Sequence, residues 1–290
     1  MTPVVGAIHR PQLPPEHLVE SAREAERLGI AELWVWEDCF LTAGISAATA
    51  ALASTEQLTV GLGLMPAPLR NVAVAAMEVA TVSRLFPGRF RLAVGHGVQD
   101  WMGQVGARAA SPVNLLREYV VALRALLHGE EVTVDGDYVR LDHVRLDWPP
   151  TIVPPVLVGA VGPRTLALAG EVADGVLLDA DLTAETARAS IDTCVAARVA
   201  AGTTGRFEVV AYQRAYLGSD ADEQLANDAR PGGLDAGVAN DAAEAARRVT
   251  ALGGAGVGTV VLMPSATQPD AASYLRWVAG DVGNALTGTA

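Results

Sequence analysis

The chain has 290 residues, of which 50% are hydrophobic, 19% charged and 5% aromatic, and its formal net charge is -12. This hydrophobic content excludes intrinsic disorder, which requires low hydrophobicity together with high net charge. The excess of 33 acidic over 21 basic residues predicts no nucleic-acid partner, because a negative surface repels phosphate backbones.

The sequence carries no signal for a membrane, for secretion or for a metal. No apolar run approaches the roughly 20 residues that cross a bilayer, and the first residues lack a basic segment followed by a long apolar one. We therefore expect no membrane partner and a cytoplasmic location. Two cysteines without a CxxC pair and five histidines without HExxH spacing predict neither a disulfide scaffold nor a metal site.

Short runs rich in valine and leucine alternate with longer alanine-rich runs along almost the whole chain. The first kind predicts strands that start near Val4, Leu33, Leu58, Phe90, Val156, Val176, Phe207 and Val257. The second kind predicts helices over residues 15–29, 44–55, 71–85, 111–128, 163–172, 183–201, 239–252 and 269–284. Strands this apolar are typical of a parallel sheet covered by helices. We predict a closed (β/α)8 TIM barrel, a single domain over residues 1–290, with a doubly wound open sheet as the alternative.

Two stretches interrupt the alternation. Residues 132–141, before the fifth strand, alternate apolar and polar side chains around Asp135-Gly136, which predicts an inserted hairpin. We expect this hairpin to wall one side of the barrel mouth. A long polar segment, residues 218–238, follows the seventh strand, and such an insertion is typical of a lid or a site wall.

The carboxyl ends of the strands are where barrel enzymes place their functional residues. At the second strand end, Glu37 and Asp38 suit a general base or a ligand contact, or else an ion pair with Arg10 or Arg70. His96, between two glycines at the fourth strand end, is either ligand-facing or a satisfied structural histidine. Cys39 is more typical of a small buried residue than of a nucleophile.

Residues 162–165 open the fifth predicted helix. Glycine lets a ligand approach the backbone, proline suits the first helical turn, and the free N–H groups there attract phosphate. Arg164 is placed to add a contact to phosphate oxygens. The alternative is an ordinary turn with a solvated arginine.

Four blocks resemble one family. LWVWEDCF at 33–40, LTVGLGLMP at 58–66, GRFRLAVGHGV at 88–98 and PPVLVGAVGPRTLALAGEVADGVLL at 154–178 follow in order. They are similar to the luciferase-like flavin- and F420-dependent oxidoreductases, and the last block resembles the deazaflavin branch.

The resemblance implies a (β/α)8 barrel that binds coenzyme F420, with FMN as the alternative cofactor. It implies that Asp38 contacts the ring region and that Gly63 and Leu64 form a bulge behind the ring, with a non-prolyl cis peptide. The other cofactor-binding residues that it implies are His96, Gly97, Val161, Gly162, Arg164 and Thr165.

Departures from the family pattern bear on the chemistry. Cys39 stands where many deazaflavin enzymes have histidine, and Val98 stands where the sugar-phosphate branch has its proton-donating glutamate. Asp179 and Leu182 replace residues that hold the sugar phosphate, which argues against glucose 6-phosphate as the substrate. We therefore take His9, Asp38 and His96 as the catalytic candidates, the histidines because a strand-end imidazole titrates near neutral pH.

The predicted function is hydride transfer between coenzyme F420 and a small organic substrate that the sequence does not identify. The alternatives are an FMN-dependent monooxygenase that uses reduced flavin and O2, and a flavin-binding barrel without turnover. A lysine Schiff base is excluded, because the sequence contains no lysine. Alanine-rich second and third helices also predict a homodimer.

Overall fold

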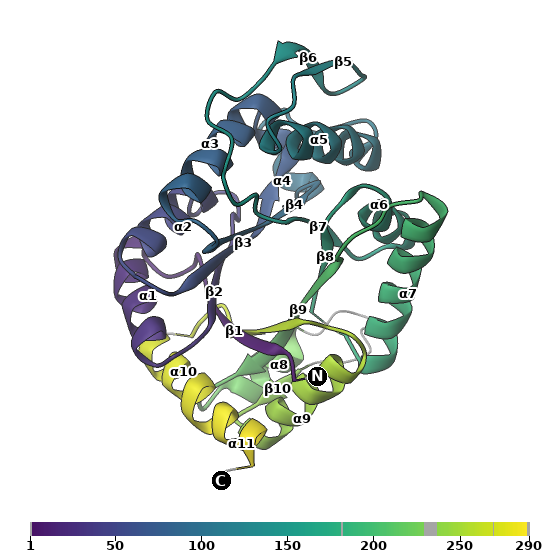
Figure 1. The fold of residues 1–290 in the computed structure, drawn as a ribbon. Coiled ribbons are helices and arrows are strands. Elements are labelled where there is room, and N and C mark those ends of the chain that lie inside the picture. Colours follow the sequence, from purple (N-terminus) through teal and green to yellow (C-terminus); the bar gives the residue numbers. More distant parts are fainter. Residues whose placement is uncertain (1, 181, 229–236, 269, 289–290) are drawn as a thin grey trace.

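The structure is a computed structural model that describes residues 2–180, 182–228, 237–268 and 270–288. Within these residues, eight parallel strands close into a barrel, and an outer ring of helices surrounds them (Figure 1). The strands are β1 (Val4–His9), β2 (Glu32–Val35), β3 (Thr59–Pro66), β4 (Phe90–Gly95), β7 (Val156–Ala160), β8 (Gly175–Leu178), β9 (Glu208–Tyr216) and β11 (Thr259–Met263). Pairing of β8 with β9 closes the ring, so the TIM barrel is confirmed and the open sheet was wrong.

The helices follow the strands in the order that the sequence predicts. They are α1 (Leu18–Arg27), α2 (Gly44–Ala53), α3 (Val72–Leu85), α5 (Pro112–Leu127), α6 (Pro163–Val172), α7 (Ala184–Ala200), α9 (Ala242–Gly254) and α10 (Ala271–Trp277), the last continuing through residues 278–282 into α11 (Gly283–Thr287). The element η1 (Pro15–His17) begins the helix predicted over residues 15–29 and leads directly into α1, whereas the short elements η2 (Ala67–Leu69), α4 (Gln99–Gln104), α8 (Ala221–Asp228) and β10 (Val238–Ala239) were not predicted. They lie in loops, where a few residues give too little periodicity to read.

The barrel has two apolar layers because successive strand residues point to opposite faces. Ile8, Trp34 and Leu157 belong to a cluster that fills the barrel, whereas Ala7, Leu33 and Val158 join the larger cluster between strands and helices. This alternation decides which strand-end side chains reach the barrel mouth.

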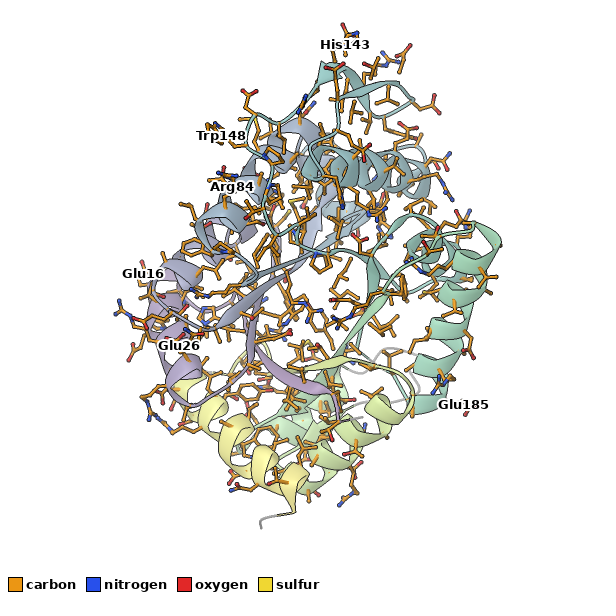
Figure 2. The ribbon with its side chains drawn as sticks, viewed as in Figure 1. Glu16, Glu26, Arg84, His143, Trp148 and Glu185 are labelled. Carbon is orange, nitrogen blue, oxygen red and sulfur yellow. The ribbon has the colours of Figure 1, made fainter. Side chains whose placement is uncertain are left out.

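The predicted hairpin exists, but it does not wall the mouth. Strands β5 (Val132–Asp135) and β6 (Arg140–Val144) pair antiparallel and project beyond α5 (Figure 1). The Glu118 carboxylate of α5 accepts the N–H groups of Tyr138 and Val139, each at 2.9 Å. Figure 2 shows His143 at the outer end of this hairpin. The hairpin thus covers a helix because the carboxylate on α5 binds its turn.

Of the polar segment 218–238, the structure describes residues 218–228, 237 and 238. Its beginning forms α8, and Tyr216 at the end of β9 donates a hydrogen bond of 2.6 Å to Asp228. The seventh barrel strand therefore runs to Tyr216, beyond the predicted end near Arg214. None of the described helices has a stretch both long and apolar enough to span a bilayer.

Candidate active site

A cavity of about 400 Å³ opens at the carboxyl ends of the strands. Eight of the predicted site residues line it: Asp38, Gly63, Leu64, His96, Gly97, Val161, Gly162 and Thr165. Two predicted residues, His9 and Arg164, do not. The ends of four strands that are far apart in sequence, β2, β3, β4 and β7, therefore bring these eight residues to one cavity.

A bulge in β3 forms the back of the cavity. The pairing of β3 with β4 shifts register between Gly63 and Met65, and the peptide bond between Gly63 and Leu64 is cis, as the resemblance implies. A second cis bond, between Cys39 and Phe40, was not predicted.

Neighbouring glycines make room for the bulge. A Cβ on Gly95 would lie 2.7 Å from a Leu64 methyl group, and a Cβ on Gly159 would lie 2.5 Å from the same methyl group. Such distances are inside van der Waals contact, so a side chain at either glycine would force the Leu64 side chain to move.

Tyr212 holds the bulge from inside the barrel. Its side chain is buried, and the hydroxyl donates a hydrogen bond of 2.5 Å to the carbonyl oxygen of Gly63. Its ring packs against Trp34 and Trp36, with centroids 6.3 Å and 5.6 Å away. Burial raises the pKa of Tyr212 well above its usual value, so the hydroxyl stays a donor at every working pH. Sequence analysis missed Tyr212, although the two-residue period from buried Val210 points it inward.

Asp38 is a carboxylate of the cavity wall whose surroundings change its pKa. Burial raises its pKa, and the nearby Arg10 guanidinium acts in the opposite direction. Arg10 lies over the Trp36 ring, 4.8 Å from the centroid, and donates a hydrogen bond of 2.8 Å to the carbonyl oxygen of Pro264. Asp38 thus lines the cavity with a pKa shifted toward the range of an acid–base group.

Glu37, the residue before Asp38, forms an ion pair with Arg70. Arg70 donates to its two carboxylate oxygens at 2.5 Å and 3.1 Å, and the backbone N–H of Gly44 donates at 2.8 Å. Both oxygens are occupied, so the ion-pair interpretation is confirmed. The pair anchors α2 to the strand end that carries Asp38.

His96 lies half-buried on the cavity wall, with its Nδ1 atom 3.0 Å from the carbonyl oxygen of Gly97. Gly97 has a φ of 71°, and a Cβ there would lie 2.9 Å from the sulfur of the buried Met102. Glycine is therefore required at this turn, which directs the His96 ring to the cavity. Val98 also lines the wall and is 48% exposed.

The start of α6 forms the opposite rim. Gly162 caps the helix, Pro163 occupies its first turn, and a Cβ on Gly162 would meet nothing within 4 Å. Thr165 is buried and lines the cavity, whereas Arg164 is exposed. The helix start therefore offers open backbone to an anion, and Arg164 stands outside the wall.

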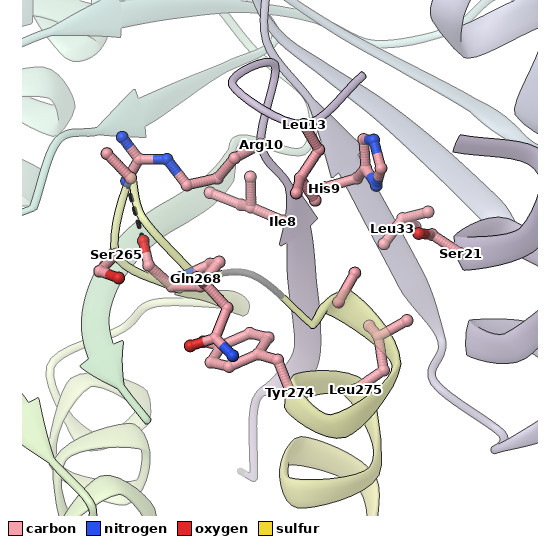
Figure 3. A pocket seen from close by; sticks show the side chains of 13 residues that line it. Ile8, His9, Arg10, Leu13, Ser21, Leu33, Ser265, Gln268, Tyr274 and Leu275 are labelled. Carbon is pink, nitrogen blue, oxygen red and sulfur yellow. Dashed lines mark hydrogen bonds between the residues drawn. The ribbon is translucent and has the colours of Figure 1, made fainter. Parts of the chain in front are cut away.

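His9 takes no part in this cavity. Ile8 occupies the inward position of β1, so His9 faces the helix layer, where Figure 3 shows its ring beside Ser21 and Leu33 and away from Arg10. Only 6% of the residue is exposed, and burial lowers its pKa to about 4. An imidazole on the outer face of a strand cannot meet a ligand inside the barrel.

Comparisons with known proteins identify the family. A family profile described as luciferase-like monooxygenase matches residues 1–259. The chain belongs to this family. The match covers seven of the barrel strands and reaches the first residue of β11, so it includes every residue that lines the cavity described above.

Curated relatives within the family carry related names. A 5,10-methylenetetrahydromethanopterin reductase of Methanolobus tindarius is 31% identical over 170 residues, 59% of this chain and 52% of that protein. An F420-dependent hydroxymycolic acid dehydrogenase of Mycobacterium tuberculosis is 31% identical over 176 residues, 55% of this chain and 48% of that protein. The matched segments thus span about half the length of these relatives.

Solved structures share the fold over their full length. A structure described as an F420-dependent secondary alcohol dehydrogenase in complex with an F420-acetone adduct superposes with a TM-score of 0.86. It is 22% identical, and the match covers 99% of each chain. The coenzyme F420-dependent tetrahydromethanopterin reductase of Methanopyrus kandleri gives a TM-score of 0.81 at 19% identity, covering 97% and 99%. At these identities the likeness shows the barrel fold.

Proposed function

We propose that this protein is an oxidoreductase that transfers a hydride between coenzyme F420 and a small organic substrate. The observation that carries the proposal is the cavity in which the Gly63–Leu64 bulge, Asp38 and the start of α6 meet. The names of the relatives support F420 over FMN, because the reductase and dehydrogenase relatives include proteins called F420-dependent.

The residues present suit such a cofactor. Side chains of Trp36, Leu64 and Trp101 give apolar walls for a flat ring, and the Gly162 turn leaves backbone open to a phosphate. In this assignment Gly63, Leu64, His96 and Gly97 lie along the ring and its side chain, and Val161, Gly162 and Thr165 hold the phosphate. Arg164 would then add only long-range attraction, because its side chain is exposed.

When bound, the deazaflavin supplies the hydride-accepting or hydride-donating carbon, and the protein supplies orientation, water exclusion and a proton source. Asp38 is the acid–base group that we propose, because it lines the cavity and burial raises its pKa. His96 is the second candidate. His9 drops out of this role, since it faces the helix layer.

The decisive experiment is a cofactor titration. Ligand-free protein is mixed with oxidised F420 and, separately, with FMN, and the fluorescence of each is followed. We expect F420 to be quenched with a micromolar dissociation constant and FMN to bind at least tenfold more weakly.

Other outcomes assign the protein differently. A preference for FMN would replace the proposal with oxygenation by reduced flavin and O2. Binding of F420 without turnover of any hydride donor or acceptor would indicate a binding protein, and binding of neither cofactor would contradict the proposal.

A further inference from the structure

Arg10 lies among the ends of three neighbouring strands. It directly follows β1, which pairs with β11 and with β2. Its Nη1 atom donates a hydrogen bond of 2.8 Å to the carbonyl oxygen of Pro264, directly after β11 (Figure 3). Its Nε atom donates one of 3.1 Å to the Oε1 atom of Gln12. These two bonds fix the plane of the half-buried guanidinium.

The guanidinium also contacts the wall of the cavity of about 400 Å³, which we call the central cavity. It lies over the ring of Trp36, directly after β2, with its Cζ atom 4.8 Å from the ring centroid. An arginine within about 6 Å of an indole face makes a favourable contact. Trp36 lines the central cavity and Arg10 does not. Arg10 therefore affects this cavity through its neighbours, and Trp36 is one of them.

Asp38, two residues after Trp36, is the second neighbour through which Arg10 acts. Its carboxyl lies on the wall of the central cavity. Burial raises the pKa of Asp38, and the Arg10 guanidinium lowers it. A nearby opposite charge favours the ionised form of a carboxyl. Arg10 thus opposes the effect of burial on the group that we propose for acid–base chemistry.

The other titratable groups around Asp38 do not replace this positive charge. The charge of Asp38 acts on Cys39 and on Tyr212, and burial raises the pKa of both, so they are neutral at pH 7. The Arg70 guanidinium binds the Glu37 carboxylate directly. Among these neighbours, Arg10 is the cation that acts on Asp38.

Arg10 has further neighbours outside the central cavity. Burial lowers the pKa of Arg10, and Tyr216, Asp38, Asp228 and Tyr274 act in the opposite direction. Asp228 is exposed on α8 and accepts the hydrogen bond of Tyr216. An arginine side chain keeps its charge at every working pH. The guanidinium is therefore a permanent cation behind the cavity wall.

We propose that Arg10 is a positioning residue of the central cavity, which holds the Trp36 indole in the cavity wall and favours the ionised form of Asp38. That this wall receives a deazaflavin ring rests on the proposed function. The effects of Arg10 on Trp36 and Asp38 do not depend on it.

A matched control for Arg10 exists on the outside of the molecule. Arg84 lies over the exposed ring of Trp148, 5.2 Å from the centroid, and donates a hydrogen bond of 3.0 Å to the carbonyl oxygen of Pro149. Arg84→Met therefore removes the same two kinds of contact as Arg10→Met, far from the central cavity.

The first test uses ligand-free protein and nuclear magnetic resonance. We expect the carboxyl ¹³C resonance of Asp38 to titrate at higher pH in Arg10→Met than in the unaltered protein, and the indole ¹⁵N–¹H resonance of Trp36 to shift. Both resonances should stay unchanged in Arg84→Met. Equal behaviour of Asp38 and Trp36 in the two variants would overturn the proposal.

Arg10→Lys separates the charge from the planar contact. Lysine keeps the cation and has neither a planar face nor a fork of donors. We expect Asp38 to titrate as in the unaltered protein and the Trp36 resonance to shift as in Arg10→Met. Titration of Asp38 at the higher pH of Arg10→Met would overturn the role of the charge, and an unshifted Trp36 resonance would overturn the role of the planar contact.

The second test is the quenching of F420. Arg10→Met should weaken F420 binding roughly 2- to 10-fold, and Arg84→Met should leave it unchanged. The pH dependence of turnover should move to higher pH in Arg10→Met, a change that lost packing alone does not produce. Equal quenching in both variants would contradict the role of Arg10 in the cofactor site. Altered Asp38 and Trp36 resonances in Arg10→Met, with no quenching of F420 by the unaltered protein, would contradict the proposed function and support the role of Arg10.

Discussion

Glu37 and Asp38 are adjacent in the chain, yet the fold gives their carboxylates different roles. The Glu37 carboxylate is closed off by Arg70 and the Gly44 N–H, and Asp38 faces the cavity with only the more distant Arg10 to balance its charge. Two consecutive residues therefore have different roles: Glu37 is a structural anchor, and Asp38 is a candidate acid–base group.

Replacing Asp38 by asparagine should stabilise the protein at neutral pH and impair its reaction. Because burial raises the pKa of Asp38 above its usual value of 3.8, the folded state holds this proton more tightly than the unfolded state. Its contribution to stability is full below pH 3.8 and is lost as pH rises through the folded pKa. Asp38→Asn should therefore gain unfolding free energy at pH 7, and the gain should vanish toward pH 3.8.

Chemical denaturation at both pH values checks this stability effect. The rate of F420 oxidation or reduction should fall roughly 100-fold or more if Asp38 moves the proton. A variant that is no more stable at pH 7, or that keeps its full rate, would contradict these roles.

Removing Arg70 should strongly destabilise the protein. Arg70 and Glu37 have side chains only 16% and 8% exposed, and Arg70→Ala would leave a buried carboxylate without its partner. We expect a loss of about 3–5 kcal/mol in unfolding free energy. Arg27→Ala breaks a pair in which the arginine is 65% exposed, and it should change the unfolding free energy far less, because solvent screens the pair. Urea denaturation of both variants makes the comparison.

At the scale of the elements, the bulge of β3 depends on a strand from across the barrel. Tyr212 of β9 reaches the Gly63 carbonyl, 149 residues away in the chain, and a Cβ on Gly63 would lie 2.2 Å from the tyrosine hydroxyl. The bulge, its glycine and the tyrosine therefore form one unit.

Tyr212→Phe should weaken both stability and cofactor binding. It leaves a buried carbonyl unpaired, which costs about 1–3 kcal/mol, and it frees the bulge that we assign to the ring. The matched control is Tyr138→Phe on the hairpin, whose hydroxyl accepts the Ser111 N–H at 2.7 Å. We expect thermal stability to fall in both variants and F420 quenching to weaken in Tyr212→Phe alone. Equal F420 quenching in both variants would show that the bulge does not contribute to cofactor binding.

At the scale of the whole molecule, α3 presents an apolar face to solvent. Val74 and Met77, one turn apart on this helix, are 48% and 60% exposed. Adjacent exposed apolar side chains on a helix are typical of a protein–protein contact. We propose that this face joins two copies of the chain, in line with the homodimer predicted from the alanine-rich helices.

Met77→Glu should then convert the dimer to a monomer, because it buries a carboxylate without a partner in the interface. Light scattering coupled to size exclusion gives the mass. Val121→Glu, on the exposed side of α5 where the residue is 50% exposed, should keep the mass of the unaltered protein. A monomeric unaltered protein would contradict the homodimer.

Local patterns in the sequence were enough to predict the barrel, and the resemblance to a family added most of the residues of the cavity wall. The alternation of runs rich in valine and leucine with alanine-rich runs can be recognised from neighbouring residues alone. The helix predicted over residues 163–172, for example, has the same boundaries as α6 in the structure. Glycines at Gly63, Gly97 and Gly162 also carry local information, because backbone turned toward a ligand excludes a side chain.

Which polar side chains contact one another depends on how distant strands and helices pack. His9 ends one apolar strand and Asp38 follows another, yet the inward position of Ile8 turns His9 to the helix layer. Tyr212 and Gly63 contact each other only because closure of the barrel brings β9 across from β3. The partner of a buried polar group is set by packing between distant segments, and no local pattern of residues contains it.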